Sequence, residues 1–396
     1  MRFAHLADCH IGGWRDPTMR DLSIKAFAKA VSVAIEKKLD FVLISGDLFN
    51  TSFPNIDNLK QVFLELKRLK EEDIPVYLIP GSHDFSASGK TMLDLLDLAG
   101  LAHNVYKAKE VEGKLRLEYS EDKSGAMITG SLGLRGMLER GIYTGLDRSS
   151  LDGEGFRIFM FHTALTEMKP DDMQMMASSP ISMLPAGFDY YAGGHVHVVM
   201  EKKVEGYGPI VFPGPLFPNN FREMEKLGTG GFYIYEDGEL YYHELKGFEL
   251  SKVIIECDSL SAEDIEKEIL SALEKDLTNH IVTIRLFGTM EGKPSDIDFR
   301  SIYRTLYSHG ALFVMKNMNK LQSEKFEDSD LDHDVDDIES RVIEDTAGTI
   351  SIGLSEQEEV RMSRNLMKAL SMEKDEGERS YDFEKRLIRE IDKIIP

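Results

Sequence analysis

Five short apolar runs in the first half of this 396-residue chain each end in a polar cluster. In chain order the clusters are Asp8-Cys9-His10, Gly46-Asp47-Leu48-Phe49-Asn50, Gly81-Ser82-His83-Asp84, Phe161-His162 and Gly194-His195-Val196-His197. Short apolar runs bounded by turn residues are typical of buried strands. Ligands of α/β sheets collect at the carboxyl ends of strands, so these clusters predict a fold that brings five strand ends to one place.

Between the clusters, strand-like and helix-like segments alternate. Apolar residues recur at a spacing of about 3.6 in 22–35 and 59–69, which predicts helices there. The expected strands are 3–7, 41–44, 76–79, 156–161, 198–204, 210–212, 232–235 and 240–243. This βαβα pattern indicates an α/β domain that closes with an antiparallel sheet near residue 248. Segment 163–185, with five Met and three Pro, predicts a loop or short helix over the site, its Met residues serving as packing.

Composition leaves the partner open. Hydrophobic residues at 42% and charged residues at 29% are typical of a soluble globular protein, and no segment approaches the roughly 18 apolar residues of a membrane span. A net charge of -22 argues against a nucleic-acid partner, but residues 324–396 carry half of that excess, with 22 acidic and 11 basic side chains. Two cysteines and the lack of a secretory signal at the start predict a cytoplasmic protein.

The second half of the chain predicts further units. Residues 249–322 follow a βαβαβ pattern without a catalytic cluster, which suits recognition or a lid better than chemistry. Residues 323–353 are acidic and turn-rich and indicate a linker, while 354–396 predict two amphipathic helices. The apolar faces of these helices need a covering surface. It is either the body of this chain or, as we favour because of the intervening linker, another protein.

Histidine, carboxylate and oxygen ligands together suit borderline divalent ions such as manganese, iron or zinc. One Asp can bridge two such ions about 4 Å apart, which activates water and clamps the oxygens of a phosphate. Taken singly, each cluster has an ordinary alternative, since Asp8 and His10 suit a loop hydrogen bond, Asp47 a helix cap and His162 a buried imidazole. Five clusters at five strand ends favour a metal site.

The ordered clusters resemble those of the calcineurin-like metallophosphoesterases. Within that superfamily, segments 3–12 and 45–49 and the Tyr190-to-His197 block are similar to the nuclease subunit of the double-strand-break repair complex. This is the SbcD family, called meiotic recombination eleven in archaea and eukaryotes. The resemblance implies an α/β sandwich of two mixed sheets flanked by helices (1–248), a small α+β capping domain (249–322), an acidic linker (323–353) and a C-terminal helix pair (354–396).

The resemblance also implies roles for the clustered residues. One metal would be held by Asp8, His10, Asp47 and His197, and the other by Asp47, His162 and His195, with Asp47 as the bridge. Ser82 stands where the family has an amide ligand of the second metal, and its shorter hydroxyl puts occupancy of that site in doubt. His83 would stabilise or protonate the leaving oxygen, with Asp84 orienting it. The cofactors are then two divalent ions, expected to be manganese, and Cys9 serves as packing.

In function, the resemblance implies a DNA repair nuclease with 3'-to-5' double-strand exonuclease and single-strand endonuclease activity, cytoplasmic and nucleoid-associated. It would act as a homodimer on DNA ends with a Rad-fifty/SbcC-type ABC ATPase, bound through residues 354–396. Two rivals stay open: a phosphodiesterase or phosphatase of the same fold, and an end-tethering scaffold with weakened catalysis. Arg15 and Arg20 are candidate phosphate contacts or ordinary surface, and helix 59–69 is a candidate dimer interface or core.

Overall fold

The computed structural model describes residues 1–86, 89, 91–273, 276–323, 356–370, 372 and 380–394. Contacts between Cα atoms divide the chain into two units, Met1–Gln322 and Ser323–Pro396, which are described separately. Apart from Ser323, the expected acidic linker lies outside the described residues. So does Ser355, which we expected to cap the first C-terminal helix.

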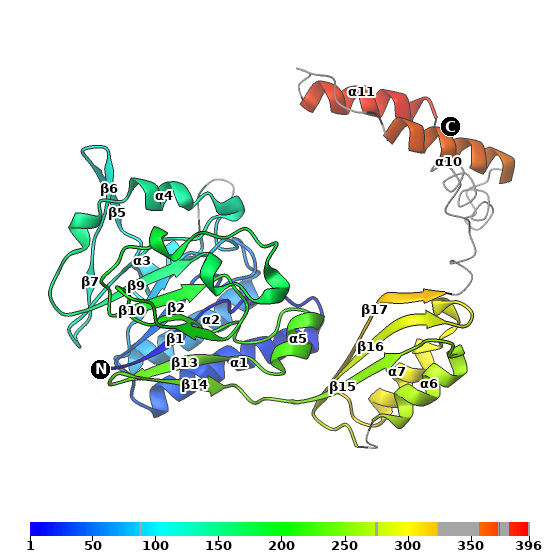
Figure 1. Ribbon diagram of the computed structural model, residues 1–396, viewed down its shortest axis with the longest axis horizontal. Helices are drawn as coiled ribbons and strands as arrows, with labels where there is room; N and C mark the ends of the chain where they lie inside the picture. Colours follow the sequence, from blue (N-terminus) through cyan, green and yellow to red (C-terminus); the bar gives the residue numbers. More distant parts are fainter. Residues whose placement is uncertain are drawn as a thin grey trace. The chain divides into compact units, whose positions relative to one another are not determined.

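Strand β1 lies inside the first of two six-stranded sheets (Figure 1). It runs parallel to β2 and antiparallel to β13, and β2, β3 and β4 are mutually parallel, so the sheet is mixed. The strand order is β14 (Glu239–Glu244), β13 (Gly231–Glu236), β1 (Arg2–Leu6), β2 (Phe41–Ser45), β3 (Val76–Ile79) and β4 (His103–Asn104). The antiparallel pair β13 and β14 closes this sheet, as the sequence predicts.

The second sheet is also mixed. Strands β8, β9, β10 and β12 are parallel, while β7 and β11 run antiparallel to their neighbours at the two edges. The order is β11 (Met200–Lys202), β12 (Ile210–Phe212), β10 (Tyr190–Gly194), β9 (Phe156–His162), β8 (Ala126–Gly130) and β7 (Ser120–Glu121). A separate hairpin joins β5 (Ala108–Val111) to β6 (Lys114–Leu117). Strand β11 is shorter than the expected 198–204 because the backbone turns at Val198, whose N–H bonds the Val196 carbonyl.

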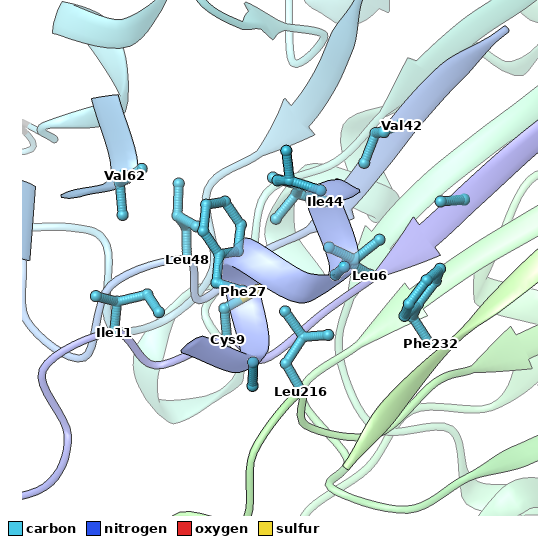
Figure 2. Close-up of a cluster of buried hydrophobic side chains, with 14 of the residues drawn as sticks. Leu6, Cys9, Ile11, Phe27, Val42, Ile44, Leu48, Val62, Leu216 and Phe232 are labelled. Carbon is cyan, nitrogen blue, oxygen red and sulfur yellow. The ribbon is translucent and has the colours of Figure 1, made fainter. Parts of the chain in front are cut away.

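Alternation of side chains along the strands builds the core between the sheets. In β1 and β2, Phe3, Phe41 and Leu43 point inward and pack against Tyr190 and Ile158 of the second sheet. Their neighbours along each strand point to the opposite face and pack against helices, in a cluster that also contains Cys9 (Figure 2). The expected sandwich of two mixed sheets flanked by helices is confirmed.

Helices α1 (Pro17–Glu36) and α2 (Ile56–Glu71) supply the helical side of that outer cluster. Helix α1 begins five residues before the predicted start because the Asp16 side chain accepts from the N–H groups of Thr18 and Met19. The remaining short helices of this part are α3 (Leu93–Leu98), α4 (Arg140–Gly145), α5 (Phe221–Leu227), η1 (Arg135–Met137) and η2 (Arg148–Leu151).

Segment 163–185 contains three short 3-10 turns, η3 (Thr166–Met168), η4 (Asp171–Met173) and η5 (Ile181–Met183). Met168 is buried in the core beside the second sheet, and three further Met side chains of the segment pack partly against it. Met175 is fully exposed. The expectation that these Met residues serve as packing is therefore confirmed for four of the five.

A smaller part follows β14 within the same unit, and we call residues 249–322 the small unit. Its sheet has the order β15-β16-β17, with β15 parallel to β16. Its elements are β15 (Glu249–Glu256), α6 (Ala262–Ser271), β16 (His280–Met290), η6 (Pro294–Asp296), α7 (Phe299–Ser308) and β17 (Phe313–Ser323). Buried aliphatic side chains of both helices and all three strands form its own core. The βαβαβ pattern expected here is confirmed.

In the second unit the structure describes α10 (Glu356–Leu370) and α11 (Ser380–Asp392), which contact each other. Met367, Leu370 and Ile388 are nevertheless exposed. Among the described residues of the whole chain, no helix is long and apolar enough to cross a membrane.

Helix α2 offers a test of the packing. Leu66 is fully buried in the outer cluster, whereas Leu64 on the same helix is 47% exposed. Leu66→Ala is expected to lower the free energy of unfolding by about 2–5 kcal/mol, since it removes buried methyl groups and leaves a cavity. Leu64→Ala, the matched control, should change it by about 0.5 kcal/mol or less. Urea unfolding followed by circular dichroism measures both, and equal losses would contradict this packing.

Candidate metal centre

The polar clusters converge where strands of both sheets end. Asp8 follows β1, Asp47 follows β2, and the Ser82-His83-Asp84 loop follows β3 in the first sheet. His162 ends β9 in the second sheet, and His195 and His197 follow β10 beside it. The five strand ends are thus brought to one place, as the sequence predicts.

Four of these residues have an unusual backbone. The φ angles of Asp8 (49°), His10 (42°), Asp47 (51°) and His195 (89°) are all positive, a region that non-glycine residues rarely adopt. Hydrogen bonds hold the strained loops together, from the Asp8 N–H to the Gly46 carbonyl and from the His10 N–H to the Asp47 carbonyl. Strain of this kind persists only where the surroundings enforce it and clusters at functional sites.

Three sets of side chains bring their ligand atoms within 4.8 Å of one another. The sets are Asp8, His10 and His197; Asp8, Asp47 and His162; and His10, Asp47 and His83. Asp47 Oδ2 lies 3.2 Å from His162 Nε2 and 3.6 Å from His10 Nε2, and Asp8 Oδ1 lies 3.7 Å from His197 Nε2. The carboxylates therefore lie between imidazoles from both sheets.

His195 and Ser82 lie at the border of these sets. The His195 ring packs against that of His162, with centroids 5.1 Å apart, and its backbone N–H donates to the Asp8 carboxylate. The Ser82 hydroxyl is 3.5 Å from Asp47 Oδ2, at the limit of a hydrogen bond. His195 belongs to none of the three sets, and its contacts to them run through the His162 ring and its own backbone N–H.

Three rings make a hydrogen bond through Nδ1, and Nε2 of two of them, His162 and His197, faces the carboxylates. His162 Nδ1 bonds the Ser45 carbonyl at 2.8 Å, His83 Nδ1 the Asn50 carbonyl at 2.9 Å, and His197 Nδ1 the Glu223 carboxylate at 2.8 Å. In His162 and His197, a proton on Nδ1 leaves the lone pair on Nε2, the usual arrangement of a metal-binding His.

The buried carboxylates of Asp8 and Asp47 shift the pKa values of the His side chains around them. Burial alone would lower the pKa of His162, but Asp47 and Asp8 raise it to about 10. Burial likewise opposes the charge of His197, whose pKa Glu223 and Asp8 raise to about 9. Burial lowers the pKa of His10 to about 3 and that of His195 to about 4. The two carboxylates thus attract any available positive charge, which a divalent cation would supply more strongly than a proton.

The site also fits metal ions sterically and chemically. His10 Nδ1 and His162 Nε2 are buried and make no hydrogen bond of good geometry. A Cβ on Gly81 would collide with the Asp47 carboxylate, and one on Gly194 would lie 2.8 Å from His162 Nδ1, so both positions need glycine. Oxygen and imidazole donors of this kind suit manganese, iron or zinc. The residues present therefore fit divalent cations.

Asp84 bonds backbone groups of two loops. It is buried and accepts from the N–H groups of Gly81 (2.9 Å) and Phe49 (3.2 Å), which joins the loops after β2 and β3. Burial and the charge of Asp47 raise its pKa to about 7. The Asn50 carbonyl bonds Nδ1 of the His83 ring, so a role of Asp84 in orienting that ring, which stays a prediction, would act through the loops that it joins.

Sequence reasoning missed two side chains at this site. Glu223 lies on α5, 26 residues after its partner His197, and no motif connects the two. Arg135 lies in the loop after β8 and donates from Nε to the Ser82 carbonyl at 3.2 Å. Arg135 follows the end of β8, a sixth strand that ends near the site. No His or Asp follows that strand closely, so no sequence pattern was a reason to include it. Of the expected phosphate contacts, Arg20 donates to the Arg15 carbonyl at the surface.

Comparisons with known proteins agree with this geometry. Archaeal proteins named DNA double-strand break repair protein Mre11 are similar to this chain: 28% identity over 69% of it for Archaeoglobus fulgidus, 29% over 59% for Methanococcus maripaludis and 26% over 68% for Methanopyrus kandleri. The matches cover 65%, 62% and 61% of those proteins, so the chain spans less than two thirds of their length.

One sequence profile covers half of the chain. That of the calcineurin-like phosphoesterases matches residues 1–199, the part that contains Asp8, Asp47, His162 and His197. With its sandwich of two mixed sheets and its buried Asp and His sets, this chain belongs to the calcineurin-like phosphoesterase family.

Proposed function

We propose that this protein is a metal-dependent DNA nuclease that processes double-strand breaks. The observation that carries the proposal is the convergence of Asp8, Asp47, His162 and His197 in a chain similar to proteins named for that repair. Phosphodiester hydrolysis needs positive charge beside the phosphate and an activated water, and a centre of this composition provides for both. Double-strand exonuclease and single-strand endonuclease activity, as the resemblance implies, are the proposed reactions.

The proposed ligands are those carried over from the family. Asp8, His10, Asp47 and His197 hold one cation, and Asp47, His162 and His195 the other, with Ser82 as a weak additional ligand. Bound manganese would supply the charge that neutralises the phosphate and lowers the pKa of water. Asp8 belongs to one set with His197 and to another with His162, which supports two neighbouring positions.

His83 is the proposed acid for the leaving oxygen. Its Nδ1 is fixed by the Asn50 carbonyl, and its backbone N–H donates to Asp47 at 2.8 Å, so the ring has a defined position beside the carboxylate. Nε2 remains to stabilise or protonate an oxygen that departs from phosphorus. Asp84 supports this arrangement indirectly, since it joins the loops that carry Asp47 and His83.

The proposed partners are DNA ends, a second copy of the chain and an ABC ATPase. Exposed Met367, Leu370 and Ile388 support docking of the C-terminal helices on the ATPase. Exposed Leu64 on α2 and Leu98 on α3 support a dimer surface. The small unit is proposed to act as the DNA-capping domain. Domain boundaries at 248, 322 and 353 remain part of this proposal.

Cleavage separates this proposal from its rivals. With manganese, the protein is expected to cut linear duplex DNA much faster than bis(p-nitrophenyl) phosphate. His83→Ala should lower kcat on DNA about 100-fold or more, because an acid for the leaving oxygen is lost, while bound manganese stays unchanged. A gel assay with metal analysis measures both. Preference for the small ester would favour the phosphodiesterase, and no cleavage at all would favour the scaffold.

Occupancy of the second position should be limited by the short side chain at position 82. Ser82→Asn supplies the longer amide ligand and is expected to raise the manganese bound per chain, counted by electron paramagnetic resonance titration. His195→Ala should lower the manganese bound per chain by emptying the second position. The first position should stay filled, since it retains Asp8, His10, Asp47 and His197. Ser82→Ala is the control and should change little. Equal loss of both ions in His195→Ala would contradict the two unequal positions.

Docking of the ATPase is tested on α11. Ile388→Ser replaces an exposed apolar side chain and is expected to weaken binding to the coiled-coil base of the ATPase at least 10-fold, with Arg389→Ser as a polar control on the same helix. Deletion of residues 354–396 should abolish binding while DNA cleavage persists. Isothermal titration calorimetry measures ATPase binding by each variant, and undiminished binding after the deletion would refute the assignment.

A further inference from the structure

Helix α5 lies between His197 and the small unit. It has only seven residues, and isolated helices of that length are unstable in water, so its position depends on contacts at its ends and sides. Met224 is its one fully buried side chain and packs into the outer cluster of the first sheet. Its polar residues point to three different parts of the chain.

Glu223 joins α5 to His197. One carboxylate oxygen lies 2.8 Å from His197 Nδ1 and accepts from the Asn220 side chain, and the other accepts from the Asn219 N–H at 2.8 Å. The Asn220 side chain in turn caps the helix by accepting from the Glu223 N–H. The carboxylate is thus fixed on every side and holds the His197 ring with Nε2 toward Asp8. A carboxylate behind a metal-binding His sets the ring orientation and tautomer.

Glu225 joins the same helix to the small unit. Arg285 of β16 places its Nε 3.0 Å from both carboxylate oxygens of Glu225 and also donates from Nη2. The Glu225 side chain is only 13% exposed, and the guanidinium also lies over the Phe221 ring at 5.1 Å. Lys252 of β15 donates to the Glu225 carbonyl. Partly buried ion pairs of this geometry are far more specific than exposed ones.

A third contact is weaker. Arg222 and Lys226 pair with Asp172 of segment 163–185, but all three side chains are at least 41% exposed. Exposed pairs contribute little to position. The small unit therefore holds α5 more firmly than segment 163–185 does.

We propose that Glu223 is a positioning residue for His197, and that the Glu225–Arg285 ion pair makes this positioning depend on the small unit. The inference rests on the proposed role of His197 as a metal ligand. The small unit, whose described residues include no metal-binding set, then acts on the centre through helix α5. A change in its contacts with DNA or a partner would shift α5 and change how well His197 holds its metal.

The first arm of the test measures manganese affinity of the purified protein by electron paramagnetic resonance titration, without DNA. Glu223→Ala should weaken binding about 10–100-fold, the usual effect of removing such a carboxylate. Glu223→Gln keeps an acceptor for Nδ1 and should recover part of the affinity. Unchanged affinity in Glu223→Ala would overturn the inference. If the unsubstituted protein binds no manganese, the proposed function itself fails.

The second arm tests the connection. Arg285→Ala should weaken manganese binding severalfold and add nothing in a Glu223→Ala background, because both changes act through His197. Arg285→Lys keeps the charge and should recover part of the effect. Arg116→Ala breaks the Arg116–Asp147 pair far along the chain from α5 and should leave affinity unchanged. Full affinity in Arg285→Ala, or effects that add in the double variant, would overturn the connection.

Discussion

The carboxylate of Asp47 holds together loops from both sheets. It lies 3.2 Å from His162 of the second sheet and accepts from the His83 N–H of the first. Burial opposes its charge, yet His162, His10 and the His83 N–H keep its pKa well below the usual range. An ionised, buried carboxylate is costly unless it is paired. The strained backbone at Asp47 and the glycine at 81 follow from the need to bring partners close to that one group.

Much of this architecture is predictable from three features of the sequence: the alternation of strands, the 3.6-residue spacing of helices, and the rule that parallel strands of one sheet end at the same edge. Strands with alternating buried faces and helices such as α2 appear directly in the apolar pattern. Parallel strands of one sheet share an edge, so Asp8, Asp47 and Ser82 had to meet there. The same rule predicted that His162 and His195 also follow strand ends, but no local pattern shows that their strands form a second sheet facing the first.

The unpredicted parts depend on contacts between distant segments. Glu223 meets His197 only because α5 returns to the sheet edge after β12, and short helices leave little periodic signal. The Asn50 carbonyl is a backbone group, and residue type carries no information about where it points. The hydrogen bonds of Asp84 were unpredictable for a similar reason, since its partners are the backbone N–H groups of Gly81 and Phe49 in two separate loops.

The net charge of -22 affects how the site would attract a phosphate. An acidic protein repels the phosphates of DNA, and the strength of that repulsion at the site depends on Asp8 and Asp47, which are buried there. Divalent cations at this site would reverse the local sign of the charge, so binding of metal and of phosphate would be coupled. If His197 is a metal ligand, as we propose, any element that changes how firmly it holds a cation would also change the attraction for a phosphate substrate. Helix α5 is such an element, because its Glu223 contacts His197.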